Sequence, residues 1–111
     1  MSNFLNTLRS YRINPSRYIK IVKFIAQSQG YNPERIEFSD NPNKKLSYTL
    51  DNGKKVHFGA NGYLDYILYL ILRPELAEEM RRRYRARATE TALQTEDKYS
   101  PANLSLKILW T

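Results

Sequence analysis

Apolar and polar side chains alternate along residues 46–50 and again along residues 55–58. A period of two is typical of β-strands with one apolar face, and the Asp-Asn-Gly sequence between them is typical of a hairpin turn. A three-residue loop pairs Tyr48 with Val56 and keeps the apolar side chains on one face, whereas a two-residue loop mixes the faces. We therefore predict a three-residue loop in which Gly53 takes the left-handed conformation.

The same alternation over residues 35–39 predicts a third strand. Residues 35–58 then form a three-stranded antiparallel meander, which is about the minimum for a stable sheet. We expect the apolar face of this sheet to be covered by a helix at residues 63–72, part of which could instead lie in an interface with another chain. The side chains expected on that face are Ile36, Phe38, Leu46, Tyr48, Val56 and Phe58.

Helix signals flank the meander on both sides. A helix is predicted from Asn14-Pro15 to about residue 28, because an Asn cap followed by Pro favours a helix start. Residues 63–72 are apolar nearly all round, residues 74–88 place acids before arginines as the helix dipole favours, and residues 101–110 end in an apolar cluster. The predicted fold class is α+β, a small three-stranded antiparallel meander packed with about four helices.

Two further segments have weaker patterns. Residues 1–13 are interpreted as a short helix or a docking arm, and residues 89–98 as a polar loop. The two glycines of Gly59–Gly62 favour either a phosphate cradle of backbone N–H groups at a helix N-terminus or a plain steric corner. The spacing lacks the lysine of a P-loop and the full dinucleotide-binding fingerprint.

Charge is distributed unevenly along the 111 residues, whose net charge is +7. Residues 1–30 contain five Lys or Arg and no acidic residue. Such a field suits nucleic acid, an anionic membrane surface or an acidic protein. The basic edge of the helix could contact phosphate, but a solvated helix face is the commoner explanation, because basic helix faces are common without ligands. The candidate anion or nucleic-acid contacts are Arg17, Lys20, Lys23, Lys54 and Lys55.

Apolar and aromatic residues suggest an interface with a partner protein, because tyrosine and tryptophan suit surfaces that are partly wet. The candidate interface residues are Tyr66, Ile67, Tyr69, Leu70 and Trp110. The longest uninterrupted apolar run, residues 66–72, is too short for a bilayer, which needs about 20 residues. We therefore expect no transmembrane segment.

The residue types of an active site are scarce. His57 is the only histidine and there is no cysteine, so neither a histidine cluster nor a thiolate metal site is expected. The acidic residues fall in turns or at ion-pair spacing, and no nucleophile–base pattern is visible. We predict a protein that is not an enzyme and binds no cofactor or metal.

The stretch KKLSYTLDNGKKVHFGANGYLDY, residues 44–66, resembles a family of small uncharacterised proteins of the nucleocytoplasmic large DNA viruses. The pattern is a Lys-Lys pair before a strand, then GKKVHFGA-x-GY-x-DY, an arginine-rich segment and a C-terminal helix ending in Leu-Trp. In this chain those later parts fall at residues 81–87 and 100–110. The chain departs from the family in the apolar residues 67–72 and in residues 1–30, so the resemblance implies a basic helical extension at 1–30 and a family core at 31–111.

The resemblance implies a virion-associated protein, located in the virion and in the host cytoplasm during assembly, with other capsid or virion proteins as partners. Our first hypothesis is a minor capsid or capsid-associated structural protein. The second is a basic nucleic-acid-binding protein packaged with the genome, for which the charge of residues 1–30 is the motive.

Overall fold

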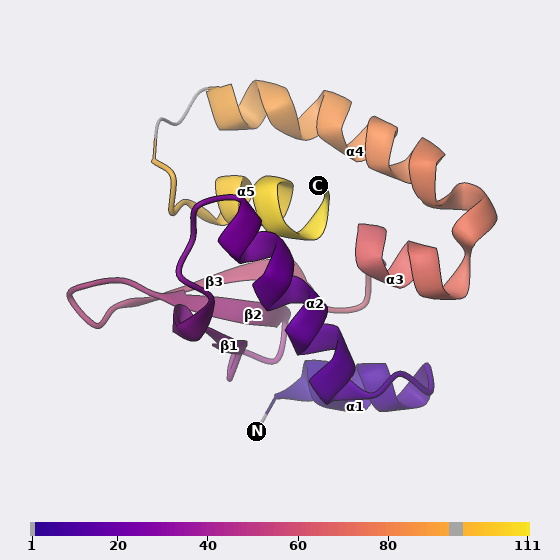
Figure 1. Cartoon of the computed structure of the whole chain (residues 1–111), viewed down its shortest axis with the longest axis horizontal. Coiled ribbons are helices and arrows are strands. Elements are labelled where there is room, and N and C mark those ends of the chain that lie inside the picture. The colour runs from indigo at the N-terminus through magenta and orange to yellow at the C-terminus, as the bar shows by residue number, and fades with distance from the viewer. Residues whose placement is uncertain (1, 94–96) are drawn as a thin grey trace. The chain divides into compact units, whose positions relative to one another are not determined.

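The computed structural model describes residues 2–93 and 97–111 (Figure 1). The chain divides into two compact units, Met1–Gly62 and Tyr63–Thr111. The first contains α1 (Asn3–Ser10), α2 (Pro15–Ser28), the 3-10 turn η1 (Pro33–Arg35), β1 (Ile36–Phe38), β2 (Lys44–Thr49) and β3 (Lys55–Ala60). The second contains α3 (Tyr66–Leu72), α4 (Pro74–Leu93), α5 (Pro101–Leu104) and the π-helical turn η2 (Ser105–Leu109). The predicted α+β class, with a three-stranded antiparallel sheet, is confirmed.

The sheet has the register that the alternating pattern predicted. Its strand order is β1-β2-β3, all antiparallel. Tyr48 pairs with both Ile36 and Val56, and Leu46 pairs with Phe38 and Phe58, so all six apolar residues share one face.

The hairpin loop between β2 and β3 has three residues, as predicted. The backbone N–H of Leu50 donates to the carbonyl of Lys54 at 2.8 Å, which closes the loop directly outside the strands. Gly53 adopts a φ of +86°, a conformation that residues with a Cβ adopt only at a cost. The loop length and the side-chain faces are therefore those of the register that the sequence predicted.

Residues 1–30 belong to the packing of the first unit, and the division after residue 30 suggested by the resemblance coincides with no boundary between the compact units. Phe4 of α1 is fully buried, and its ring centroid lies 5.2 Å from that of Tyr18 and 6.2 Å from that of Phe38. Tyr31, just after α2, contacts Tyr48 edge-on at 5.7 Å. Helices α1 and α2 therefore cover apolar residues of the sheet in their own unit.

Local signals explain where α2 begins. The Asn14 side chain accepts a hydrogen bond from the Ser16 N–H at 2.9 Å, and Pro15 occupies the first turn, where its missing N–H costs nothing. Tyr18, Val22 and Ala26 are completely buried. The cap and the buried stripe together place one face of α2 in the core and the opposite face in solvent.

Helix α3 begins later than predicted, at Tyr66 rather than residue 63. The reason is Asp65, which is 1% exposed and accepts a hydrogen bond from the Leu68 N–H at 2.9 Å. This capping contact sets the helix start at the next residue. Tyr63 consequently precedes the helix, and its side chain is 74% exposed.

Helix α4 continues to Leu93, so the prediction that it ends at residue 88 and that a loop follows directly is wrong. Residues 89–93 contain neither glycine nor proline. The two threonines in this stretch each disfavour a helix by only about 0.5 kcal/mol relative to alanine. Nothing in that stretch therefore stops the helix. Residues 94–96 of the predicted loop lie outside the described residues.

The C-terminal helix starts where predicted and then widens. The Ser100 hydroxyl accepts a hydrogen bond from the Asn103 N–H at 3.2 Å, with Pro101 next to it in the first turn. After α5 the chain continues as the π-helical turn η2, whose wider hydrogen-bond pattern is uncommon in proteins. Helical structure ends at Leu109, directly before Trp110.

Candidate interaction surfaces

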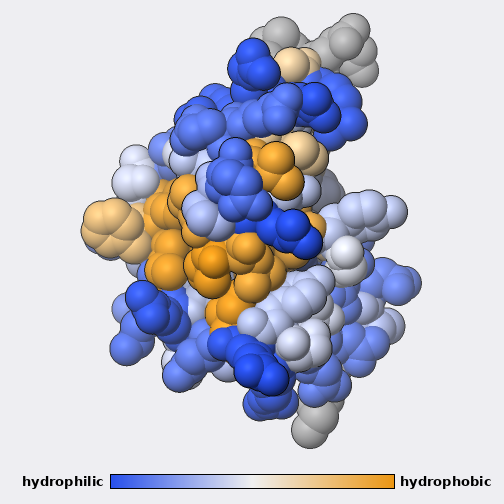
Figure 2. Space-filling view, turned by 90° about the vertical axis from the view of Figure 1, so that its right-hand side faces the viewer, coloured by the Kyte–Doolittle hydropathy of each residue, from blue (hydrophilic) through white to orange (hydrophobic). Residues whose placement is uncertain are grey.

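Large apolar side chains reach the surface among charged ones, as one face of the molecule illustrates (Figure 2). In the second unit, three of the exposed apolar residues flank the break between α3 and α4. Leu70 and Ile71 of α3 are 48% and 45% exposed, and Leu76 of α4 is 39% exposed. We call these three residues the α3–α4 apolar corner.

The five interface residues predicted from sequence are placed very differently. Ile67 and Trp110 are 4% and 8% exposed and therefore contribute to the interior. Tyr66 and Tyr69 are partly buried, and of the five only Leu70 is exposed, with about half of its surface in solvent. A helix that is apolar on all sides does not reveal which residues stay outside, so sequence reasoning missed Ile71 and Leu76.

Trp110 joins three elements of the second unit. Its ring stacks on Tyr84 of α4 with centroids 4.3 Å apart and planes 8° from parallel, and it lies 6.1 Å from Tyr69 of α3. Arg85 donates to the Trp110 carbonyl at 3.2 Å. Burial raises the pKa of Tyr84, against smaller lowering effects of a hydrogen bond with Ser105 and the charge of Arg87. We call this arrangement the Trp110 clamp.

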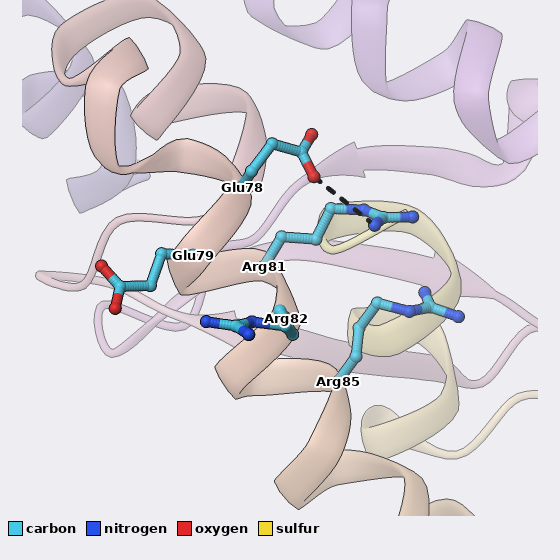
Figure 3. Close-up of a pocket in the computed structure, with 5 residues that line it drawn as sticks. All are labelled: Glu78, Glu79, Arg81, Arg82 and Arg85. Carbon is cyan, nitrogen blue, oxygen red and sulfur yellow. Dashed lines mark ion pairs between the residues drawn. The ribbon is translucent and has the colours of Figure 1, made fainter.

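The surface of α4 has a shallow hollow of about 470 Å³ lined by charged side chains (Figure 3). Its lining residues are Glu78, Glu79, Arg81, Arg82 and Arg85. As drawn, an ion pair joins Arg81 to Glu78 at 3.9 Å, and Glu79 pairs with Arg83 at 2.9 Å. Acids and arginines of one helix therefore offset each other, which makes the hollow a weak site for an anion.

Glu78 has a second partner, Tyr66 of α3. Its hydroxyl donates to Glu78, and the Arg81 guanidinium lies 5.4 Å from the centre of its ring. The hydrogen bond to Glu78 is the main cause that raises the pKa of Tyr66; burial and the Glu78 charge act in the same direction. Tyr66 thus holds α3 to α4 through contacts internal to this unit.

The basic residues predicted to contact an anion lie on two elements of the first unit. Arg17 and Lys20 are exposed on α2, and Lys23 is half-buried there. Phe24, on the same exposed side of the helix, is 76% exposed. We call Arg17, Lys20, Lys23 and Phe24 the α2 basic face; sequence reasoning missed its aromatic member.

Lys54 and Lys55 belong to the hairpin rather than to that helix. Lys54 is exposed beside the loop. The Lys55 ammonium lies 2.8 Å from the Glu37 carboxylate, and the hydrogen bond to Glu37, followed by its charge, raises the pKa of Lys55. Lys55 is thus already engaged, which lowers its value as an anion contact.

Ser39, His57 and Asp40 come together on the polar side of the sheet, which sequence reasoning missed. The Ser39 hydroxyl is 2.7 Å from Nδ1 of His57, and His57 Nε2 lies 3.9 Å from the Asp40 carboxylate. Ser39 is fully buried, and its oxygen also accepts from the Asn41 N–H at 3.0 Å. A substrate has no access to a hydroxyl in this position, so the cluster ties the β1–β2 turn to β3 rather than forming a nucleophile–base pair.

The corner at Gly59–Gly62 does not have the geometry of a phosphate cradle. Its Asn61 N–H donates to the Asn43 carbonyl at 3.0 Å, and the Asn61 amide accepts from the Thr7 hydroxyl at 2.9 Å. Helix α3 starts four residues after Gly62, behind a capping aspartate that would repel an anion. The steric corner is therefore the interpretation that fits, with Gly59 and Gly62 at φ of +79° and +100°.

The described residues form neither a metal-binding cluster nor a membrane-spanning helix. Within residues 2–93 and 97–111, no three His, Cys, Asp or Glu side chains gather in a way that would hold a metal ion. In the same described part of the chain, every helix is too short or too polar to cross a membrane.

Comparison with known proteins identifies similarity over one part of the chain. Residues 34–68 match a family of unknown function (DUF5754). The matched stretch runs from η1 through the sheet into α3 and contains residues 44–66, on which the resemblance described above depends. No curated protein and no solved structure matches the chain.

Proposed function

We propose that this chain is a non-enzymatic structural protein of a larger assembly, a minor capsid or capsid-associated component of a large double-stranded DNA virus. Two different grounds support the proposal. The resemblance of residues 44–66 supports the viral context, with the virion as the location and capsid proteins as partners. The α3–α4 apolar corner supports a role in binding another protein.

The corner is the single structural observation that carries the proposal. Leu70, Ile71 and Leu76 each leave between 39% and 48% of their surface in water. Covering the rest of such a side chain on a partner contributes about 1 kcal/mol. Apolar side chains that are exposed close together in the chain favour an interface more than scattered single ones do, since the latter need no explanation.

Fractionation of purified virions into capsid shell and genome core, followed by mass spectrometry for this chain, tests the location. We expect recovery with the shell. Absence from particles would contradict the proposal, whereas recovery with the core would favour the second candidate below.

Binding to nucleic-acid-free capsid shells tests the surface. The double variant Leu70→Ser with Ile71→Ser should reduce co-sedimentation with the shells at least several-fold. The control is Phe24→Ser, which removes an even more exposed apolar side chain from the first unit and should leave co-sedimentation unchanged. Equal binding by wild type and double variant would rule out this corner as the interface.

The second candidate is a basic nucleic-acid-binding virion protein. The observation that favours it is the α2 basic face, in a segment of 30 residues that has no acidic residue. Binding through phosphate contacts must weaken steeply with salt. Affinity for nucleic acid that stays constant between low and moderate salt would eliminate this candidate.

A further inference from the structure

We infer that the α2 basic face binds single-stranded nucleic acid, with Phe24 stacking on a base while Arg17 and Lys20 contact backbone phosphates. This inference rests on the second candidate function and specifies its ligand. It assigns a task to the most exposed large apolar side chain of the chain's described part, Phe24.

The helix presents these residues together because of its periodicity. Arg17, Lys20 and Phe24 are spaced by three and four residues, and such positions share one face of an α-helix. The opposite face, with Tyr18, Val22 and Ala26, is fully buried in the first unit. Arg17 and Phe24 lie about 11 Å apart along the helix axis, since each residue advances about 1.5 Å.

The positive charge of the segment that contains Phe24 has no acidic residue nearby in sequence, unlike that of Arg81 and Arg83 on α4. Residues 1–30 contain no acidic residue that could offset Arg17 or Lys20. On α4, by contrast, Arg83 lies 2.9 Å from Glu79 of the same helix. The α2 basic face therefore favours an anionic ligand, and a single exposed aromatic ring within it favours a ligand that also has flat apolar groups.

A single strand fits both features. Its phosphates suit the cations, and its unpaired bases stack on aromatic rings whatever their sequence. The bases of a duplex are already stacked on each other, so a duplex would use the cations but not Phe24.

A membrane surface fits less well. A helix that lies in a lipid interface inserts a continuous apolar face. The apolar face of α2 is committed to the core, which leaves one ring among polar neighbours. If the α2 basic face were instead a site for an acidic protein, it would recognise charge alone. It would then not discriminate between single-stranded and duplex nucleic acid, and the experiment below distinguishes the two cases.

Fluorescence anisotropy of the full chain with labelled oligo(dT), and with a duplex of equal length, tests the inference. Phe24→Ala should weaken oligo(dT) binding roughly 5- to 150-fold, the range that corresponds to the loss of one stacked base. Phe24→Trp should restore it, since tryptophan also stacks. Because Phe24 is exposed, these variants should fold as wild type, which circular dichroism checks.

A second variant separates stacking from charge. Replacing Arg17 and Lys20 by Gln should reduce the slope of log affinity against log salt by about 1.4, since each phosphate contact to a single strand contributes about 0.7. Lys54→Gln removes one charge from the hairpin and is the matched control for location.

The possible results distinguish two failures. Unchanged oligo(dT) binding by Phe24→Ala, or equal affinity for duplex and single strand, would overturn the inference and leave the second candidate function in place. Equally strong competition by polyglutamate would also overturn it, because only charge would then be recognised. No binding to either nucleic acid at low salt would remove the second candidate function as well.

Discussion

The two compact units of this chain are stabilised by different kinds of contact. Met1–Gly62 is organised by the strand register of its sheet, and two polar contacts, Lys55 with Glu37 and His57 with Ser39, reach across β2 from β3 to the β1 side. The described elements of Tyr63–Thr111 are helical and meet at the Trp110 clamp. We therefore expect the stability of the first unit to be spread over many contacts and that of the second unit to be more sensitive to the loss of Trp110.

The units also differ in how they carry positive charge. On α2 the cations have no acidic neighbour in sequence, whereas two arginines of α4, Arg81 and Arg83, follow glutamates by three or four residues and pair with them. The number of arginines alone would select α4 as the anion site. The arrangement of the charges favours α2 as the candidate anion site instead, because ion pairs within one helix reduce the field that a ligand experiences.

The largest effect expected from this comparison concerns Trp110. The change Trp110→Ala should destabilise the second unit by about 3–5 kcal/mol, the usual cost of removing a large buried aromatic side chain. Hydrogen exchange measured by NMR should show lost protection in α3 and α4 and retained protection in β2 and β3. Phe24→Ala serves as the control with an exposed ring. Uniform loss of protection in both units would show that they do not respond separately.

A smaller effect is expected for the polar contact in the first unit. Ser39→Ala removes the partner of His57 Nδ1 and of the Asn41 N–H in a buried position, which should cost about 1–3 kcal/mol. Urea denaturation of wild type and variant measures it. Ser10→Ala, at an exposed serine of α1, should change the midpoint far less. Equal midpoints for both variants would mean that the cluster does not stabilise the turn.

The smallest effect is expected for the ion pair between Lys55 and Glu37, both of which are partly exposed. The pKa of Lys55 is raised above its ordinary value of 10.5 by the hydrogen bond to Glu37. A raised folded-state pKa means that the stabilisation is complete below the unfolded-state pKa and is lost as pH rises through the folded-state pKa.

Lys55→Gln should therefore lower the urea midpoint slightly at neutral pH, and the difference from wild type should vanish at pH values above the raised pKa. Lys54→Gln removes the same charge from the same hairpin and controls for net charge. A difference between Lys55→Gln and wild type that persists at high pH would assign the effect to packing of the lysine stem instead.

Sequence reasoning succeeded where neighbours in sequence decide the structure. The hairpin follows from alternating side chains and an Asp-Asn-Gly turn, and the starts of α2 and α5 follow from caps at Asn14 and Ser100. It failed at the start of α3 and the end of α4, because Asp65 was not recognised as a cap and residues 89–93 have no stop signal. The paired acids and arginines of α4 were visible in sequence, although Glu78 contacts Arg81 rather than the residue four positions on.

The sequence by itself determined the α+β class, the strand register and the acid-free basic segment, because each depends on local periodicity, turn chemistry or composition. Only the tertiary structure decided that Ile67 and Trp110 are interior while Leu70 is exposed, and that Ser39 meets His57. Those outcomes depend on which distant elements pack together, and an apolar helix has no local feature that tells its inner side from its outer side. Phe24 shows the same limit from the other direction, since only packing revealed that this ring remains in solvent beside Lys20.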